Sequence, residues 1–268
     1  MALPFNRLLR TAAVSAALLI SPVTWADETS TQSLIQGDDN VEQLEQLGKE
    51  LRVLLRPEIG FPVEYVSAWQ SAVDEAFAPA LLEADYIEAL EAGLTEDSRA
   101  AAIAYYQSDL ASQVAAQTTK IDPDETLSFE EELGKAAAMI ESATAEQNAL
   151  YVDVFERQHG AETANAVMDA YYRMMKTGAE PIIGAEAADE WVAGIGSSLR
   201  DQYVEGNFAT TAAGLSTVDP DLLRELAEVL ADPDLASYSE QASQAFGYAI
   251  DAAADRLATA YPKALANL

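Results

Sequence analysis

The chain has 268 residues, with 15 basic and 45 acidic side chains, one histidine and no cysteine. Hydrophobic residues make up 50%, which is enough material for a packed core. A sequence without cysteine excludes disulfides and thiolate metal sites, and one histidine excludes centres that need several imidazole ligands. The net charge of −30 repels phosphate backbones, so we expect no nucleic-acid partner.

Residues 1–26 have the features of a secretory signal peptide. Arg7 and Arg10 form a basic start, an apolar stretch follows, and Ala26 offers a small residue at the cleavage position. The apolar stretch has about half of the ~20 residues that a spanning helix needs, which favours cleavage over an uncleaved membrane anchor or a buried N-terminal helix. We therefore predict a periplasmic protein with no integral membrane segment after cleavage. Removal of the two arginines changes the net charge from −30 to −32.

The polar residues 27–40 are predicted to be a flexible acidic leader, and residues 41–120 a first helical unit. Apolar side chains at helical spacing predict helices near 41–55, 63–77 and 79–93. Thr95 is the expected N-cap of a further helix, because a threonine hydroxyl accepts from backbone N–H groups of the first turn.

Residues 121–262 are predicted to form a second helical unit, which includes central helices 128–177. Ser128 and Glu131 have the spacing of a capping box at the start of a long helix to about His159. The next helix is expected to stop at Gly178. Further helices are predicted at about 186–203, 220–230 and 234–261, the second of them capped by Asp219.

Two stretches of the sequence look alike. Leu94-Thr95 resembles Leu215-Ser216, at an offset of 121, and Asp109-Leu110-Ala111-Ser112 matches Asp234-Leu235-Ala236-Ser237, at an offset of 125. Coincidence in an alanine-rich chain is the alternative to an internal repeat. Because no segment shows sustained strand-like alternation, we predict an all-α helical bundle, built from two related helical-hairpin units plus a long central helix pair.

The motif residues resemble a known family. Gly93-Leu94-Thr95-Glu96-Asp97, Tyr105-Tyr106-Gln107-Ser108 and Asp109-Leu110-Ala111 look like the pattern of domain of unknown function 2059, a family of exported bacterial helical proteins. The resemblance covers residues 60–120 and 185–262, although the second copy has Val229-Leu230 in place of the aromatic pair. It implies an exported helical fold and carries over no catalytic residue, since the family has no established activity.

Two patterns suggest a metal site but lack essential residues. Glu156 and His159 have the Glu-x-x-His spacing of di-iron bundles, which need two histidines, so a role of His159 at a helix C-terminus is favoured. The acidic alternation from Asp122 to Glu130 resembles a calcium loop, but Leu127 stands where that loop needs glycine. We therefore predict no catalytic residue, no metal site and no cofactor.

Pairs of aromatic residues give the remaining candidate site. Adjacent helical residues point about 100° apart, so one tyrosine of a pair can face the core while the other faces a groove. Tyrosine and methionine suit adaptable partner surfaces, and core packing is the alternative. The candidate groove or partner face comprises Tyr105, Tyr106, Met168, Tyr171, Tyr172 and Met175. We expect a non-catalytic interaction or structural module of the cell envelope, whose partner is an envelope protein; the alternative is a module that binds an apolar small ligand between helices.

Overall fold

The computed structural model describes residues 31–35, 39–57, 61–118 and 129–268, which form twelve helices and no strand. The predicted all-α bundle is confirmed over these residues. The predicted signal peptide, residues 1–26, lies outside them, and so does the part from Asp122 to Ser128 of the segment, Asp122 to Glu130, that resembles a calcium loop. None of the described helices combines the length and the apolar composition that a membrane crossing requires.

The first half of the chain contributes short helices. They are α2 (Thr31–Ile35), α3 (Asn40–Arg52), α4 (Val63–Ala76), α5 (Pro79–Gly93), α6 (Glu96–Tyr106) and α7 (Asp109–Gln117). The Thr95 hydroxyl accepts from the Ser98 N–H at 3.1 Å, as predicted, and the Ser108 hydroxyl accepts from the Ala111 N–H at 3.1 Å. These two caps set the starts of α6 and α7, because each satisfies a backbone donor that the helix cannot.

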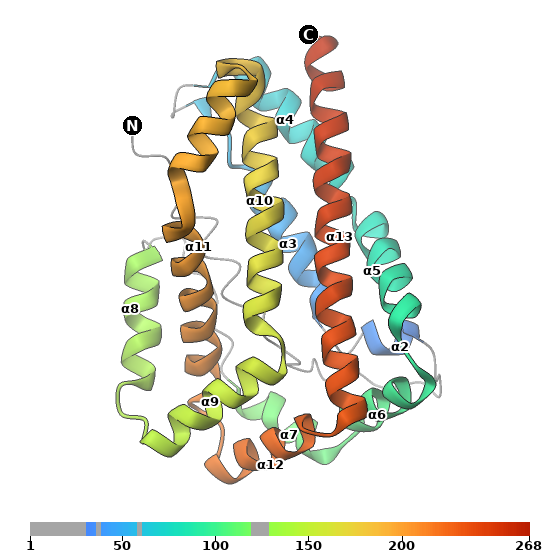
Figure 1. Cartoon of the computed structure of the whole chain (residues 1–268), viewed down its shortest axis with the longest axis vertical. Helices are drawn as coiled ribbons and strands as arrows, with labels where there is room; N and C mark the ends of the chain where they lie inside the picture. The colour runs from blue at the N-terminus through green and yellow to red at the C-terminus, as the bar shows by residue number, and fades with distance from the viewer. Residues whose placement is uncertain (1–30, 36–38, 58–60, 119–128) are drawn as a thin grey trace.

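The second half contributes the long helices. Its elements are α8 (Phe129–Ile140), α9 (Ala145–Arg157), α10 (Gly160–Ile183), α11 (Ala185–Leu215), α12 (Pro220–Leu230) and α13 (Pro233–Ala266). In Figure 1, α10, α11 and α13 run along the long axis of the molecule. The short helices α6, α7, α9 and α12 gather at one end, opposite the α10–α11 turn (Figure 1).

One predicted long helix is broken in two. The helix expected from Ser128 to about His159 ends at Ile140 and restarts at Ala145. The Thr144 hydroxyl accepts from the Gln147 N–H at 3.2 Å, and the Gln147 side chain accepts from the Thr144 N–H at 2.9 Å. This reciprocal capping box makes a helix start at Ala145 more favourable than continuation. The prediction of one helix there was wrong.

Two predicted helix ends are also wrong. Helix α10 continues through Gly178 to Ile183, and α11 continues through Tyr203 to Leu215. A Cβ at Gly178 would lie 3.2 Å from Cζ3 of Trp69, so this glycine serves close packing inside the helix. The turn is made instead by Gly184, whose φ of 84° is easily adopted only by a residue without a side chain.

Helix α13 is the centre of the core. It packs against α4, α5, α6 and α10, and α11 covers the other side of α10. Trp69 of α4 is fully buried, donates to the Leu51 carbonyl at 2.7 Å and meets the Tyr261 ring edge-on at 5.3 Å. Buried residues of both predicted units belong to one hydrophobic cluster, so the two halves share a core.

Part of the predicted leader is ordered. Thr31–Ile35 forms α2, which contacts α5 and α6, and Leu34 is fully buried. These five residues therefore depart from the flexible leader predicted for 27–40. The reason is hydrophobic: burial of one leucine side chain contributes about 1.5–3 kcal/mol, which offsets part of the entropy lost on ordering a short segment.

Candidate interaction groove

A groove of about 990 Å³ lies between two helical hairpins, which are α6 with α7 and α12 with α13. One wall is α6 with the start of α7, and we call the alanine face of this α6 wall the floor; the other wall is α12 with the start of α13. Its lining residues are Asp97, Ala100, Ala101, Ala104, Tyr105, Ser108, Leu110, Glu225, Glu228, Val229, Asp232, Asp234 and Leu235. A smaller hollow of about 670 Å³ adjoins it and shares Ala100 and Ala104.

The groove has an apolar floor and an acidic rim. Three alanines of α6 leave its backbone open to close approach, and Leu110, Val229 and Leu235 add branched side chains. Five carboxylates line the same groove, namely Asp97, Glu225, Glu228, Asp232 and Asp234. All five residues are exposed, and the described lining holds no lysine or arginine. The groove thus combines apolar area with a negative potential.

The two walls use matching positions of the predicted repeat. Ala101, Ala104 and Tyr105 on one wall lie 124 residues before Glu225, Glu228 and Val229 on the other, since 225 − 101, 228 − 104 and 229 − 105 each equal 124. Ser108 and Asp232, which cap α7 and α13, have the same separation. At these positions one wall carries alanine where the other carries glutamate, and Tyr105 where the other carries Val229. The repeat itself remains a prediction.

Direct hydrogen bonds hold the two hairpins together. The Thr217 hydroxyl donates to the Gln117 carbonyl at 2.6 Å, and the Asp219 N–H donates to the Gln117 side chain at 2.8 Å. Under the groove, the hydroxyls of Tyr106 and Tyr238 are 3.4 Å apart and both residues are buried. These contacts fix one hairpin against the other, so the groove is largely preformed.

The structure distributes the six predicted groove residues over two helices. Tyr105 and Tyr106 lie on α6, and the other four lie on α10. Tyr105 lines the groove while Tyr106 points to Tyr238 in the core, with ring centroids 6.0 Å apart. Burial raises the pKa of the Tyr105 hydroxyl above its usual value.

The α10 members lie mainly in the core. Met168, Tyr171 and Met175 are buried, while Tyr172 is half-buried and lies 5.5 Å below the Arg200 guanidinium. Burial, and secondarily the neighbouring Tyr172, raises the pKa of Tyr171. For Tyr172, burial is the largest cause of a raised pKa and Arg200 opposes it. The structure thus places one of the six, Tyr105, in the groove between the hairpins.

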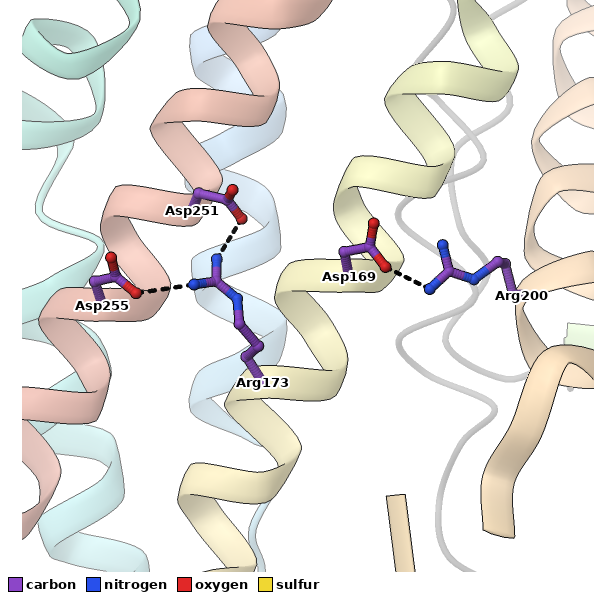
Figure 2. A network of polar contacts seen from close by, with 5 residues as sticks. All are labelled: Asp169, Arg173, Arg200, Asp251 and Asp255. Atoms are coloured by element: carbon purple, nitrogen blue, oxygen red, sulfur yellow. Dashed lines mark hydrogen bonds and ion pairs between the residues drawn. The ribbon is translucent and has the colours of Figure 1, made fainter. Parts of the chain in front are cut away.

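A separate polar network joins the long helices. Figure 2 shows Arg173 of α10 between Asp251 and Asp255 of α13, and Asp169 of α10 facing Arg200 of α11. Arg173 reaches Asp255 at 2.9 Å, and these side chains are largely exposed. Exposed ion pairs contribute about 0–1 kcal/mol each. We interpret these ion pairs as contacts that position α10, α11 and α13 relative to one another, since every charge in the network has a partner on a neighbouring helix.

His159 lies at a corner between two helices. Its φ of 54° is left-handed, α9 ends two residues before it, and α10 begins directly after it. Its Nδ1 is 4.0 Å from a Glu162 carboxylate oxygen. Among the described residues, no group of three or more histidine and acidic side chains could hold a metal ion.

The acidic rim was not identified from the sequence. Glu225 and Glu228 lie three residues apart on α12, but many acidic pairs in the chain have this spacing, so spacing alone does not select them. The available sequence signal was the pair of helix caps, Ser108 and Asp232, because they mark where four helix ends converge.

Comparisons with protein-family models, curated proteins and solved structures give no match for this chain. The resemblance to the exported helical family therefore stays a prediction.

Proposed function

We propose that this chain is a non-catalytic interaction module of the bacterial cell envelope, and that a partner protein docks in the groove between the hairpins. The observation that carries the proposal is the groove itself: an alanine floor on α6, flanked by carboxylates from both hairpins that form no ion pair within the described residues. A concave apolar site with a few polar groups at its edge is the usual form of a binding site.

The rim favours a charged partner over an apolar small ligand. Glu225 and Glu228 line one wall and Asp97 the other, and an apolar ligand offers them no counter-charge. Such a ligand would have to leave the carboxylates hydrated beside it, which limits the apolar area it can bury. The alternative hypothesis of an apolar ligand held between helices therefore has less support.

Photo-crosslinking tests the proposal. A benzophenone side chain is introduced at Ala104 on the groove floor and, as a matched control, at Ala187, which is exposed on α11. In the cells that make the protein, we expect a discrete protein adduct from position 104 and none from position 187. Replacement of Ala100 by tryptophan, which fills the groove, should abolish the adduct. Identical adducts from both positions, or none from position 104, would overturn the proposal.

We also propose that the protein is periplasmic and is cleaved after Ala26. The support is the order of charge and apolar residues in 1–26, with Arg7 and Arg10 before the apolar stretch. Intact-mass measurement on a periplasmic extract should give a chain that begins at Asp27. Recovery of the full chain from the cytosol would contradict this part of the proposal.

A further inference from the structure

We infer that the occupant of the groove is a short basic amphipathic helix of a partner protein, with its apolar face on the alanine floor and basic side chains against both walls. This inference rests on the proposed function and specifies the chemistry of the partner.

Charge is the first argument. Within the described part of the chain, none of the five rim carboxylates forms an ion pair, although arginines elsewhere on α12, α10 and α13 are paired. Unpaired carboxylates on two facing walls attract a ligand with several positive charges. A second copy of this chain would bring its own charge of −30, so self-association through the groove is disfavoured.

The arrangement of the carboxylates favours a helix. Glu225 and Glu228 are separated by three residues and therefore lie on one side of α12, while Asp97 lies at the start of α6 on the opposite wall. A partner helix presents basic side chains at the same three- or four-residue spacing along both edges of an apolar stripe. It can thus match several carboxylates at once, whereas a small amphiphile with one cation matches one.

The floor has the dimensions of a helix-packing surface. Ala100, Ala101 and Ala104 follow helical spacing on α6, and small side chains allow two helices to approach within about 8–10 Å. Helix α6 has 11 residues and is roughly 16 Å long, so it can support about three turns of a partner helix. Recognition of an amphipathic helix in an apolar groove is a recurrent binding mode.

The Tyr105 side chain gives independent support for a ligand in the same groove. Its side chain is 4% exposed and lines the groove, and within the described residues its hydroxyl has no hydrogen-bond partner. The hydroxyl oxygen is not fully buried, unlike those of Tyr171 and Tyr203, so a group bound in the groove can reach it and form a hydrogen bond with it. The hydroxyl is protonated at neutral pH, so it can donate to a carbonyl or side-chain oxygen of the occupant.

Fluorescence anisotropy with a synthetic peptide tests the inference. The probe is a fluorescein-labelled peptide of about twelve residues, composed of leucine, alanine and lysine with the lysines flanking one apolar stripe. The control has the same composition in an order that gives no apolar face. With the full chain at about 0.15 M salt, we expect the amphipathic peptide to bind at least about tenfold more tightly than the control. Equal affinity of the two peptides would overturn the inference.

Matched charge variants separate the groove from general attraction to an acidic protein. The first variant removes three rim charges, as Asp97→Asn, Glu225→Gln and Glu228→Gln. The second removes three exposed charges outside the groove, as Glu64→Gln, Glu75→Gln and Glu88→Gln. Three exposed ion pairs of ordinary strength amount to about a tenfold loss of affinity for the rim variant, against about twofold or less for the control. Equal losses would overturn the inference.

A steric pair of variants tests the floor. Ala104→Trp should weaken peptide binding about tenfold or more, while Ala187→Trp on α11 should leave it unchanged. Circular dichroism confirms that each variant is folded, and unchanged binding by a folded Ala104→Trp protein would overturn the inference. If the crosslink from position 104 forms but the amphipathic peptide does not bind, the helical partner is wrong and the proposed function stands. Loss of the crosslink overturns the proposed function itself.

Discussion

Replacement of Trp69 by phenylalanine tests the account of the core most directly. Trp69 is fully buried, its indole donates to the Leu51 carbonyl at 2.7 Å, and its ring meets Tyr261 edge-on. Phenylalanine keeps an aromatic ring but loses the donor and part of the packed volume. The Leu51 carbonyl still accepts from the Leu54 N–H at 3.0 Å, so it is not left without a partner.

The expected loss follows from these contacts. A hydrogen bond contributes about 1 kcal/mol net, and the smaller ring removes roughly 1–2 kcal/mol of burial and packing. The free energy of unfolding should therefore fall by about 2–3 kcal/mol, and Tm by roughly 4–12 °C. The loss is a large fraction of the free energy of unfolding of a native protein, which is roughly 5–15 kcal/mol.

Trp191→Phe is the matched control. Trp191 is another tryptophan of the chain, but it is only partly buried on α11. Its replacement should lower the free energy of unfolding by less than about 1 kcal/mol. Urea denaturation followed by far-ultraviolet circular dichroism measures both. Equal losses for the two variants would refute the assignment of Trp69 to the centre of the core.

Three further outcomes are expected. Thr144→Ala removes the capping box of α9 and should cost about 1 kcal/mol, with faster amide exchange confined to the start of that helix. Arg256→Met breaks the half-buried contacts to the Ala76 carbonyl and Asp85 and should lower the free energy of unfolding by roughly 1–3 kcal/mol. Arg173→Met, at the exposed network of Figure 2, should lower it by less than about 1 kcal/mol. Denaturation curves that rank the two variants oppositely would contradict this. Burial raises the pKa of Tyr261 from 10.0 to about 12, so its contribution to stability is complete below pH 10 and is lost as the pH rises towards 12. Tyrosinate absorbance should therefore appear together with the loss of the helical circular-dichroism signal. Ionisation of Tyr261 in a fully folded protein would disprove its burial.

Local polar signals in the sequence predicted helix starts well. Thr95 and Asp219 cap the helices they were expected to cap, because each signal acts within three residues of its own backbone. Thr144 and Gln147 carry the same kind of signal, a threonine three residues before a glutamine, and applying the capping-box pattern there would have located the α8–α9 break.

Helix ends depended on packing, which the sequence does not display. Gly178 looks like a stop, but it lies inside α10, where the absence of a side chain leaves room for Trp69, far away in the sequence. The candidate site, too, was predicted only in part. Tyr105 was among the residues selected, but its acidic surroundings come from α12 and the start of α13, and only the docking of the two hairpins brings them together.

The central position of α13 has a consequence for biosynthesis. Helices α4, α5 and α6 pack against it, yet Pro233 leaves the ribosome 127 positions after Tyr106, the last residue of α6, since 233 − 106 = 127. Until then the faces of α4, α5 and α6 that α13 covers lack that partner, although α3 already packs against α4 and α5, and contacts so distant in sequence form slowly. Completion of the shared core is thereby postponed until the last of the twelve described helices has been synthesised.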